Sequence, residues 1–207
     1  VAVSGGKDSL TLLKVLHDRR SFVPIKYDIL AVHIDMGYPR SCAKRLEKYF
    51  KKINVKYHIE KIDVLSKTKP KDISCFWCAW NRRKALFETA DRLGYNKIAL
   101  GHHMDDIIET ILLNLFFQGE ISAMKPNQEL FGGKIKLIRP LAYVEEYMIK
   151  RFAKEDKLPV EDCVCPNSVI SNRAKMAKII SDIKKICPDV KKNIFRSAKR
   201  VKTDYLL

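Results

Sequence analysis

Long hydrophobic runs are missing from this chain of 207 residues. No stretch approaches the roughly 20 unbroken apolar residues of a membrane-spanning helix, so we expect no membrane insertion. A secretory signal is also missing, and the abrupt start on Val-Ala-Val suggests that natural N-terminal residues precede it. There is no internal repeat or low-complexity tract, and apolar residues make up 46% of the chain, which excludes a disordered protein. We therefore expect a globular, cytoplasmic protein.

Acidic residues are few relative to basic ones. Against 24 Asp and Glu stand 40 Lys and Arg, giving a net charge of +16. Residues 166–207 carry eleven Lys and Arg against three Asp, and Lys44–Lys56 carries six basic residues against one Glu. A single charged run is usually a solvated surface, but two runs on a chain this basic favour an RNA or DNA partner.

Short apolar runs alternate with helical patterns along the first two thirds of the chain. The predicted strands are Val1–Val3, Tyr27–Ile34, Lys56–Asp63, Lys97–Leu100 and Lys136–Ile138. The predicted helices are Leu10–Asp18, Ser41–Ile53, Asn81–Leu93, Asp106–Phe117, Val144–Lys157, Ser168–Ile186 and Val190–Lys202. This alternation predicts an α/β fold with a parallel sheet covered on both faces. Because the strands stop after Pro140, we expect one domain at residues 1–141 and a helical, basic extension at residues 142–207.

A glycine-containing loop follows the first predicted strand and precedes a helical pattern. Its residues are Ser4, Gly5, Gly6, Lys7, Asp8 and Ser9. Paired glycines let backbone N–H groups approach an anion, and the positive end of the following helix points at the same place. Lys7 adds a cation, and the two serines add hydroxyl donors. The loop is therefore predicted to bind phosphate rather than to serve only as a turn.

Ser-Gly-Gly-Lys-Asp-Ser resembles the pyrophosphatase loop of the N-type ATP pyrophosphatases, the PP-loop enzymes, whose fold is adenine nucleotide alpha hydrolase-like. It is not a Walker A loop, because the four-residue spacer and the Gly-Lys-Ser/Thr ending are missing. Enzymes of this family split ATP between the α and β phosphates, adenylate a carbonyl oxygen, and let a nucleophile displace AMP. The resemblance implies that the loop binds ATP, with Mg²⁺ on its phosphates.

Further motifs narrow the resemblance. Cys75-Phe-Trp-Cys78 comes first, followed by Gly101-His-His-Met-Asp-Asp106, Ile138-Arg-Pro-Leu141 and the pair Cys163-Val-Cys165. This order is similar to that of the tRNA 2-thiocytidine synthases (TtcA-type), over residues 4 to about 173. The resemblance implies an oxygen-sensitive [4Fe-4S] cluster on three cysteines and adenylation of the C2 oxygen of an anticodon-loop cytidine.

The cluster ligands that the resemblance implies are Cys75, Cys78 and Cys165. Cys75 and Cys78 are three residues apart at the start of a helix, so both sulfurs can face one centre. The family segment has Cys-x-x-Cys followed by Gly, whereas here the pair is shortened and Pro166 follows it, so Cys163 remains an alternative third ligand. A zinc site made by all four cysteines is the competing interpretation, since a complete thiolate shell favours tetrahedral zinc.

Individual roles also follow from the resemblance. It assigns catalysis to Asp106, Arg82 and Lys7, with Asp105 or Asp106 holding Mg²⁺ or capping a helix. It adds His33 and Gly101 to the loop residues as nucleotide contacts. Arg82 would stabilise the charge that develops on the adenylated base or on the pyrophosphate.

The function predicted from these residues is that of an ATP-dependent tRNA sulfurtransferase. Its partners would be tRNA and a sulfur donor, either sulfide or the persulfide of a cysteine desulfurase, and a homodimer remains open. Three alternatives stand beside it: uridine 2-thiolation by the same chemistry, a PP-loop ligase without thiolation that resembles lysidine synthase, and an RNA-binding zinc module without turnover.

Overall fold

The structure is a computed structural model that describes residues 1–37, 41–62, 75–161 and 172–205. Its strands are β1 (Leu30–Asp35), β2 (Lys56–Lys61), β3 (Lys97–Ala99), β4 (Asn127–Leu130) and β5 (Ile135–Ile138). Its longer helices are α1 (Lys7–Arg19), α2 (Ala43–Lys52), α3 (Cys75–Arg92), α4 (Met104–Gln118), α5 (Glu146–Glu155), α6 (Asn172–Lys184) and α7 (Val190–Ser197). Short 3₁₀ turns lie at η2 (Phe131–Gly133) and η3 (Thr203–Tyr205).

Residues 1–3 hold the sheet together in its middle. The strand β1 pairs in parallel with β2, and β3 pairs in parallel with β5. Between these pairs, the N–H of Val3 donates to the carbonyl of Val32 at 2.8 Å, and the N–H of Ala2 donates to the carbonyl of Ala99 at 3.0 Å. The resulting order is β2, β1, residues 1–3, β3, β5 and β4. The parallel α/β prediction is confirmed.

The strand β4 was not predicted from the sequence. It pairs antiparallel with β5 at the edge of the sheet, with Asn127 opposite Ile138 and Leu130 opposite Ile135. Its sequence, Asn-Gln-Glu-Leu, lacks the apolar alternation that marks a strand, because both faces of this edge strand are partly exposed. Pairing with β5, rather than local preference, makes it a strand.

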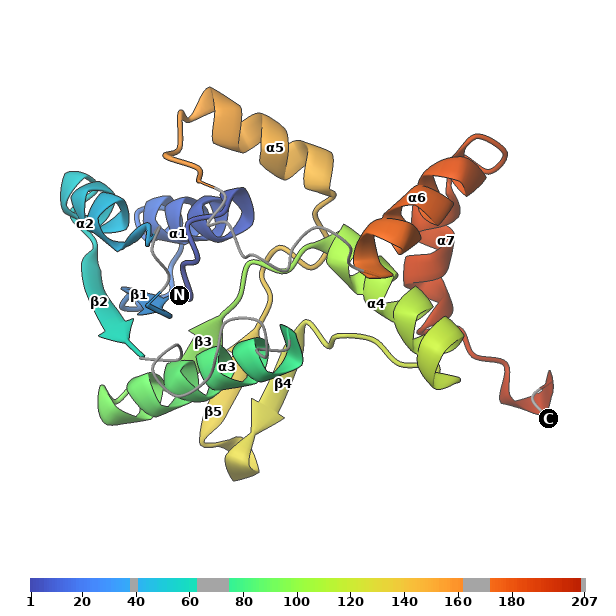
Figure 1. Ribbon diagram of the computed structural model, residues 1–207, viewed down its shortest axis with the longest axis horizontal. Coiled ribbons are helices and arrows are strands. Elements are labelled where there is room, and N and C mark those ends of the chain that lie inside the picture. Colours follow the sequence, from blue (N-terminus) through green and yellow to red (C-terminus); the bar gives the residue numbers. More distant parts are fainter. Residues whose placement is uncertain (38–40, 63–74, 162–171, 206–207) are drawn as a thin grey trace.

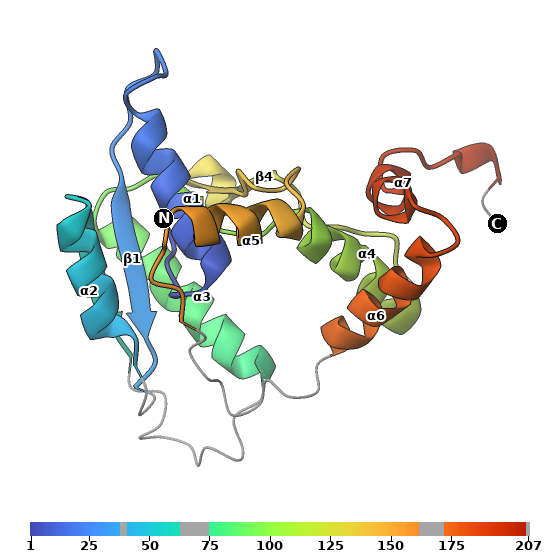
Figure 2. The same ribbon diagram turned by 90° about the horizontal axis from the view of Figure 1, so that it is seen from above.

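Alternating side chains of the strands distribute the helices over two faces. Ala31 packs with α1 and α2 around Leu10 and Phe50, whereas Val32 packs against α3 around Leu86. This is the period of two that a strand imposes on its side chains. Figure 1 shows α3 on one side of the strands, and α1, α2 and α5 on the other. Figure 2, seen from above, shows α2 and β1 at one end of the molecule and α6 and α7 at the other.

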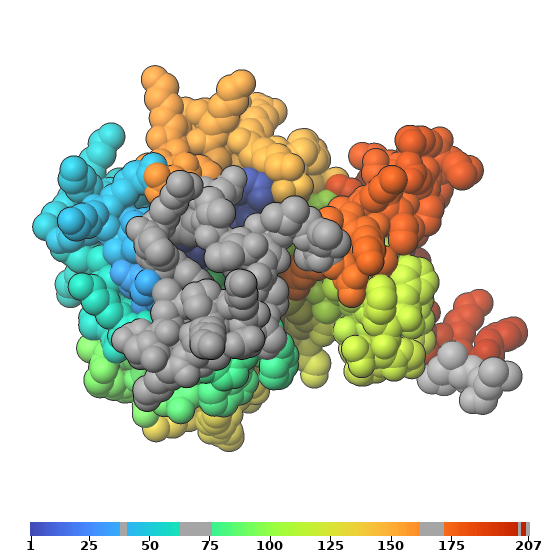
Figure 3. Space-filling model, viewed as in Figure 1, coloured from blue at the N-terminus to red at the C-terminus, as the bar shows by residue number. Residues whose placement is uncertain are grey.

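The helices α6 and α7 form a C-terminal lobe on α4. Ile108 and Leu112 of α4 pack against Met176, Ile180 and Val190 of these two helices. By contrast, α5 packs on α1, where Leu12 and Ile149 share a core cluster. The lobe therefore projects to one side of the molecule (Figures 1 and 3). No helix within the described part of the chain is both long and apolar enough to cross a bilayer.

Candidate nucleotide site between two helix starts

The loop between residue 3 and α1 is held by its own serines. Gly5 has a φ of +95°, a conformation that favours glycine. The hydroxyl of Ser9 donates to the carbonyl of Gly6 at 2.9 Å and accepts from the N–H of Ser4 at 3.1 Å. The hydroxyls of Ser4 and Ser9 are 3.2 Å apart. The loop is thus closed before any ligand binds, and the first N–H groups of α1 have no partner within the helix.

Gly101 lets the end of β3 touch the first turn of α1. A Cβ built on Gly101 would lie 2.9 Å from the carbonyl carbon of Asp8 and 3.0 Å from the nitrogen of Ser9. Backbone atoms cannot move aside as a flexible side chain can, so a side chain here would displace the loop. We predicted Gly101 as a nucleotide contact, and the structure places it directly behind the phosphate-binding turn.

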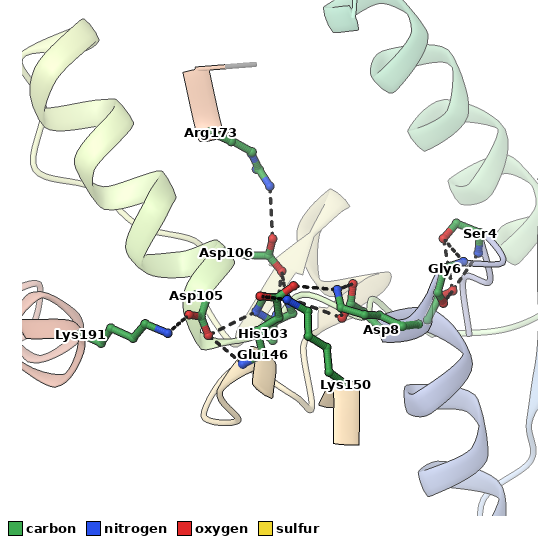
Figure 4. A network of polar contacts seen from close by, with 12 residues as sticks. Ser4, Gly6, Asp8, His103, Asp105, Asp106, Glu146, Lys150, Arg173 and Lys191 are labelled. Carbon is green, nitrogen blue, oxygen red and sulfur yellow. Dashed lines mark hydrogen bonds and ion pairs between the residues drawn. The ribbon is translucent and has the colours of Figure 1, made fainter. Parts of the chain in front are cut away.

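The helix α4 begins at the same place. His103 is its N-cap residue, and a carboxylate oxygen of Asp106 accepts the N–H of His103 at 2.9 Å. The buried ring of His103 has Nε2 3.5 Å from Asp106 and 3.6 Å from Asp8. Figure 4 shows these side chains in a row that leads to Gly6 and Ser4. The first turns of α1 and α4 therefore meet at one ring nitrogen, Nε2 of His103.

Lys7 turns toward α5. Its ammonium lies 2.9 Å from Glu146 and 3.0 Å from Asp8. Burial alone would lower the pKa of Lys7, but the hydrogen bonds that it donates to Glu146 and Asp8, and their negative charges, raise the pKa overall, so the side chain stays charged. Burial alone would raise the pKa of Glu146, yet Lys150 and Lys7 bring it down to about 2. No sequence pattern points to Glu146, because its role depends on how α5 packs on α1.

Two other titratable groups at the start of α4 have shifted pKa values. Burial, together with the nearby charges of Arg139 and Arg173, lowers the pKa of His102 to about 4 despite the opposing charge of Asp106. Nε of Arg139 also donates to Nδ1 of His102 at 3.3 Å, so the neutral ring carries its proton on Nε2. Burial and the charge of Asp106 raise the pKa of Glu109 to about 7. Neither residue was singled out for acid–base chemistry from the sequence.

His33 lies under the loop rather than on the surface. It is 6% exposed, and its Nδ1 lies 2.8 Å from the carbonyl oxygen of Val3, to which it donates. Burial lowers the pKa of His33, and the charge of Arg82 acts in the same direction. Arg82 itself is exposed on α3, one helical turn after Cys78. The structure thus places His33 beneath the loop and Arg82 close enough to His33 to act on its charge.

The cysteine prediction falls partly outside the described residues. Cys75 and Cys78 lie in the first turn of α3, and Cys78 is half-buried. Cys163, Cys165 and the side chain of Cys75 are not among what the structure describes. Among the residues that it does describe, no group of three or more His, Cys, Asp or Glu side chains forms a metal site. The thiol donors fit an iron–sulfur cluster chemically, and the choice of third ligand stays a prediction.

Carboxylates suit Mg²⁺, and this site offers them around the loop. A buried oxygen of Asp8, Oδ1, has no hydrogen-bond partner among the described residues, although Lys7 is within ion-pair distance. Asp106 faces the same ring of His103. The donor set therefore fits a divalent cation on bound phosphates.

The fold and this loop define a nucleotide-binding protein of the PP-loop class, and residues 1–164 match the PP-loop domain. The tRNA-cytidine(32) 2-sulfurtransferase of Geobacter sulfurreducens is 41% identical over 213 residues, covering 100% of this chain and 83% of the relative. The corresponding enzyme of Geotalea uraniireducens is also 41% identical, with 84% of its length covered. The chain belongs to the PP-loop family and, within it, to the family of these tRNA-cytidine 2-sulfurtransferases. The resemblance seen in the sequence is confirmed.

A solved structure agrees with this fold. The U34-tRNA thiolase NcsA from Methanococcus maripaludis, determined with its [4Fe-4S] cluster, superposes with a TM-score of 0.80. The likeness covers 100% of this chain and 71% of that protein at 23% identity. At that identity the likeness establishes the shared fold.

Proposed function

We propose that this protein is an ATP-dependent tRNA sulfurtransferase that replaces the C2 oxygen of an anticodon-loop cytidine with sulfur. The observation that carries the proposal is the meeting of two helix starts. The loop at α1 offers N–H groups and Lys7 to phosphates, and Asp106 at α4 lies beside Asp8 of that loop at Nε2 of His103. This arrangement suits a nucleoside triphosphate with a divalent cation, and membership of the tRNA-cytidine 2-sulfurtransferase family indicates tRNA as the substrate.

The reaction would take place in two steps. The C2 oxygen of the base attacks the α-phosphorus of ATP, the bond from that phosphorus to the bridging oxygen breaks, and pyrophosphate leaves with the electron pair. Sulfide then attacks C2, and the bond from carbon to the adenylated oxygen breaks to release AMP. Fixed N–H donors and cations lower the barrier of the first step by offsetting the charge that develops on the phosphates.

Each residue has a role in this scheme. Lys7 would bind the phosphates, and Asp106 would hold Mg²⁺. Arg82, exposed near His33, would face the activated base. His33 would act through the loop, because it is buried and donates to the carbonyl of Val3.

A [4Fe-4S] cluster held by Cys75, Cys78 and Cys165 would present the sulfide. Described residues on both sides of Cys163 and Cys165 contact the candidate nucleotide site. The N–H of Glu161 donates to the carbonyl of Gly5 at 3.1 Å, and Arg173 lies 3.3 Å from Asp106. The sulfur donor (sulfide or a cysteine desulfurase persulfide), a homodimer and a cytoplasmic location remain predictions.

The test is anaerobic purification followed by assay with unmodified tRNA. We expect brown protein that contains iron and acid-labile sulfide, and that makes AMP, pyrophosphate and 2-thiocytidine, the last detected by mass spectrometry of digested tRNA. Cys165→Ala should lose the iron and the thiolation. The matched variant Cys163→Ala should largely keep both.

Different failures point to different errors. Zinc without iron would exclude the cluster, and ADP as the main product would exclude adenylation. Thiolated uridine in place of cytidine would assign the protein to the alternative substrate. The reverse pattern of the two cysteine variants would make Cys163 the third ligand.

A further inference from the structure

The C-terminal lobe donates two cations to the start of α4. Nη1 of Arg173, in the first turn of α6, lies 3.3 Å from Oδ1 of Asp106. Lys191, in the first turn of α7, forms an ion pair with Asp105, whose other oxygen accepts the N–H of Glu146 at 2.8 Å. Figure 4 shows the two cations reaching the adjacent carboxylates from different sides.

Stability is a poor explanation for the Arg173 pair. The side chain of Arg173 is 46% exposed, and an ion pair that is this accessible to water contributes little to folding. The lobe already has an apolar attachment, since Met176 and Ile180 of α6 pack on Ile108 of α4. The guanidinium is therefore free to exchange partners without detaching α6.

The position of Arg173 fits a role with phosphates. Asp106 and Asp8 both lie close to Nε2 of His103, and Lys7 of the phosphate-binding loop is paired with Asp8. When Asp106 holds a divalent cation, the guanidinium would lose its carboxylate partner and would be available to phosphate oxygens at the loop. The planar donors of arginine suit phosphate oxygens, which they can bind two at a time.

We propose that Arg173 is a phosphate-binding residue of the nucleotide site, supplied by the C-terminal lobe, and that it exchanges Asp106 for the departing pyrophosphate. This inference rests on the proposed function. As the bond between the α-phosphorus and the bridging oxygen breaks, the electron pair moves onto pyrophosphate, and the guanidinium offsets that charge. Because α6 belongs to the basic residues 166–207, the same residue would link tRNA docking to ATP cleavage.

The experiment measures binding of magnesium pyrophosphate to tRNA-free protein by calorimetry, together with the rate of AMP formation on tRNA. Arg173→Gln should weaken pyrophosphate binding about 10- to 100-fold, the loss expected for one charge-assisted contact. Arg173→Lys should lie between this variant and wild type, because it keeps the charge and loses the fork. Lys175→Gln is the matched control: it removes one exposed cation two residues away on α6, and should bind pyrophosphate within about 2-fold of wild type.

Other outcomes distinguish a failure of the Arg173 proposal from a failure of the proposed function. Equal pyrophosphate affinity in Arg173→Gln and Lys175→Gln would overturn the inference, even if both bind tRNA less well. If Arg173→Gln does not fold, the affinity of Arg173→Lys decides, and a wild-type value there overturns the inference. If the wild-type protein binds pyrophosphate but never makes AMP or thiolated tRNA, the proposed function fails while the assignment of Arg173 is still judged by binding.

Discussion

The starts of α1 and α4 both lie at the imidazole ring of His103, but they differ in how their first N–H groups are occupied. Both present the positive end of a helix dipole to the same space. At α1 the first turn holds Lys7 and one carboxylate, Asp8, and no side chain caps the helix at Gly6, so the first N–H groups stay open to an external anion. At α4 the first turn holds Asp105 and Asp106, and the carboxylate of Asp106 occupies the N–H of His103.

The difference shows how one site can hold both phosphate and metal. An anion is attracted where the helix start lacks its own carboxylate cap, and a cation is attracted where carboxylates exceed what capping needs. His103 joins the two starts, because Asp8 of α1 and Asp106 of α4 both lie close to its Nε2. Three predictions can break or sharpen this comparison, beginning with the largest expected effect.

Removing the charged group at the start of α1 should change how the rate depends on ATP. Removing the charged group at the start of α4 should change how the rate depends on Mg²⁺. Lys7→Ala should slow AMP formation by about 10²- to 10³-fold and raise the KM for ATP, because a phosphate contact is lost. Asp106→Asn should slow it by a similar factor while raising the Mg²⁺ concentration needed. Initial rates over a grid of ATP and Mg²⁺ concentrations measure both effects.

The matched control is Lys14→Ala, a cation on the same helix that pairs with Asp18 and Asp156. It should leave both dependences near wild type. If Lys7→Ala and Asp106→Asn both change the KM for ATP, or both change the Mg²⁺ requirement, then the two helix starts do not bind phosphate and metal separately as we infer.

Adding one methyl group behind the loop should have the next largest effect. In Gly101→Ala the new Cβ would come within 3.0 Å of backbone atoms of Asp8 and Ser9, so the loop or the end of β3 must shift. We expect a loss of about 1–3 kcal/mol in the free energy of unfolding, measured by urea denaturation, with weaker ATP binding.

Gly6→Ala is the control for stability. Its Cβ would lie 3.6 Å from the Ser4 hydroxyl, an ordinary contact, and its φ of −73° suits any residue. Its free energy of unfolding should stay within about 0.5 kcal/mol of the wild-type value. Equal stability of the two variants would show that the close approach at Gly101 is not a constraint.

The smallest expected effect is on the pH dependence of stability. The pKa of Glu109 rises from 4.5 when unfolded to about 7 when folded, through burial and the charge of Asp106. The folded state therefore binds more protons between these values, and the free energy of unfolding falls as pH rises from about 4.5 to 7. Allowing for partial solvent screening, the free energy of unfolding should fall by about 1–2 kcal/mol over this range.

Glu109→Gln should flatten this decline, as measured by urea unfolding at pH 5 and pH 8. Glu88→Gln, an exposed carboxylate on α3 with Lys84 beside it, should keep the slope of the wild-type protein. An unchanged slope in Glu109→Gln would mean that this carboxyl does not carry the extra proton.

Much of the site was predictable because its chemistry is local. Ser4 to Ser9 are consecutive, and a strand followed by paired glycines and a helix can place their N–H groups in only a few ways. The place of Asp106 was predictable for the same reason, as it ends the short Gly101–Asp106 motif that comes after β3. The strand β4 was not, since only pairing with β5 defines it.

By itself, the sequence determined the parallel α/β fold, the phosphate-binding loop and the family. These follow from short-range patterns, namely strand and helix periodicity and motifs of adjacent residues. Only the tertiary structure decided that Glu146 holds Lys7 and that Arg173 reaches Asp106, 67 residues away. Such contacts depend on how α5 packs on α1 and how α6 packs on α4. Both packings are set by apolar faces that carry no record of which charged groups they bring together.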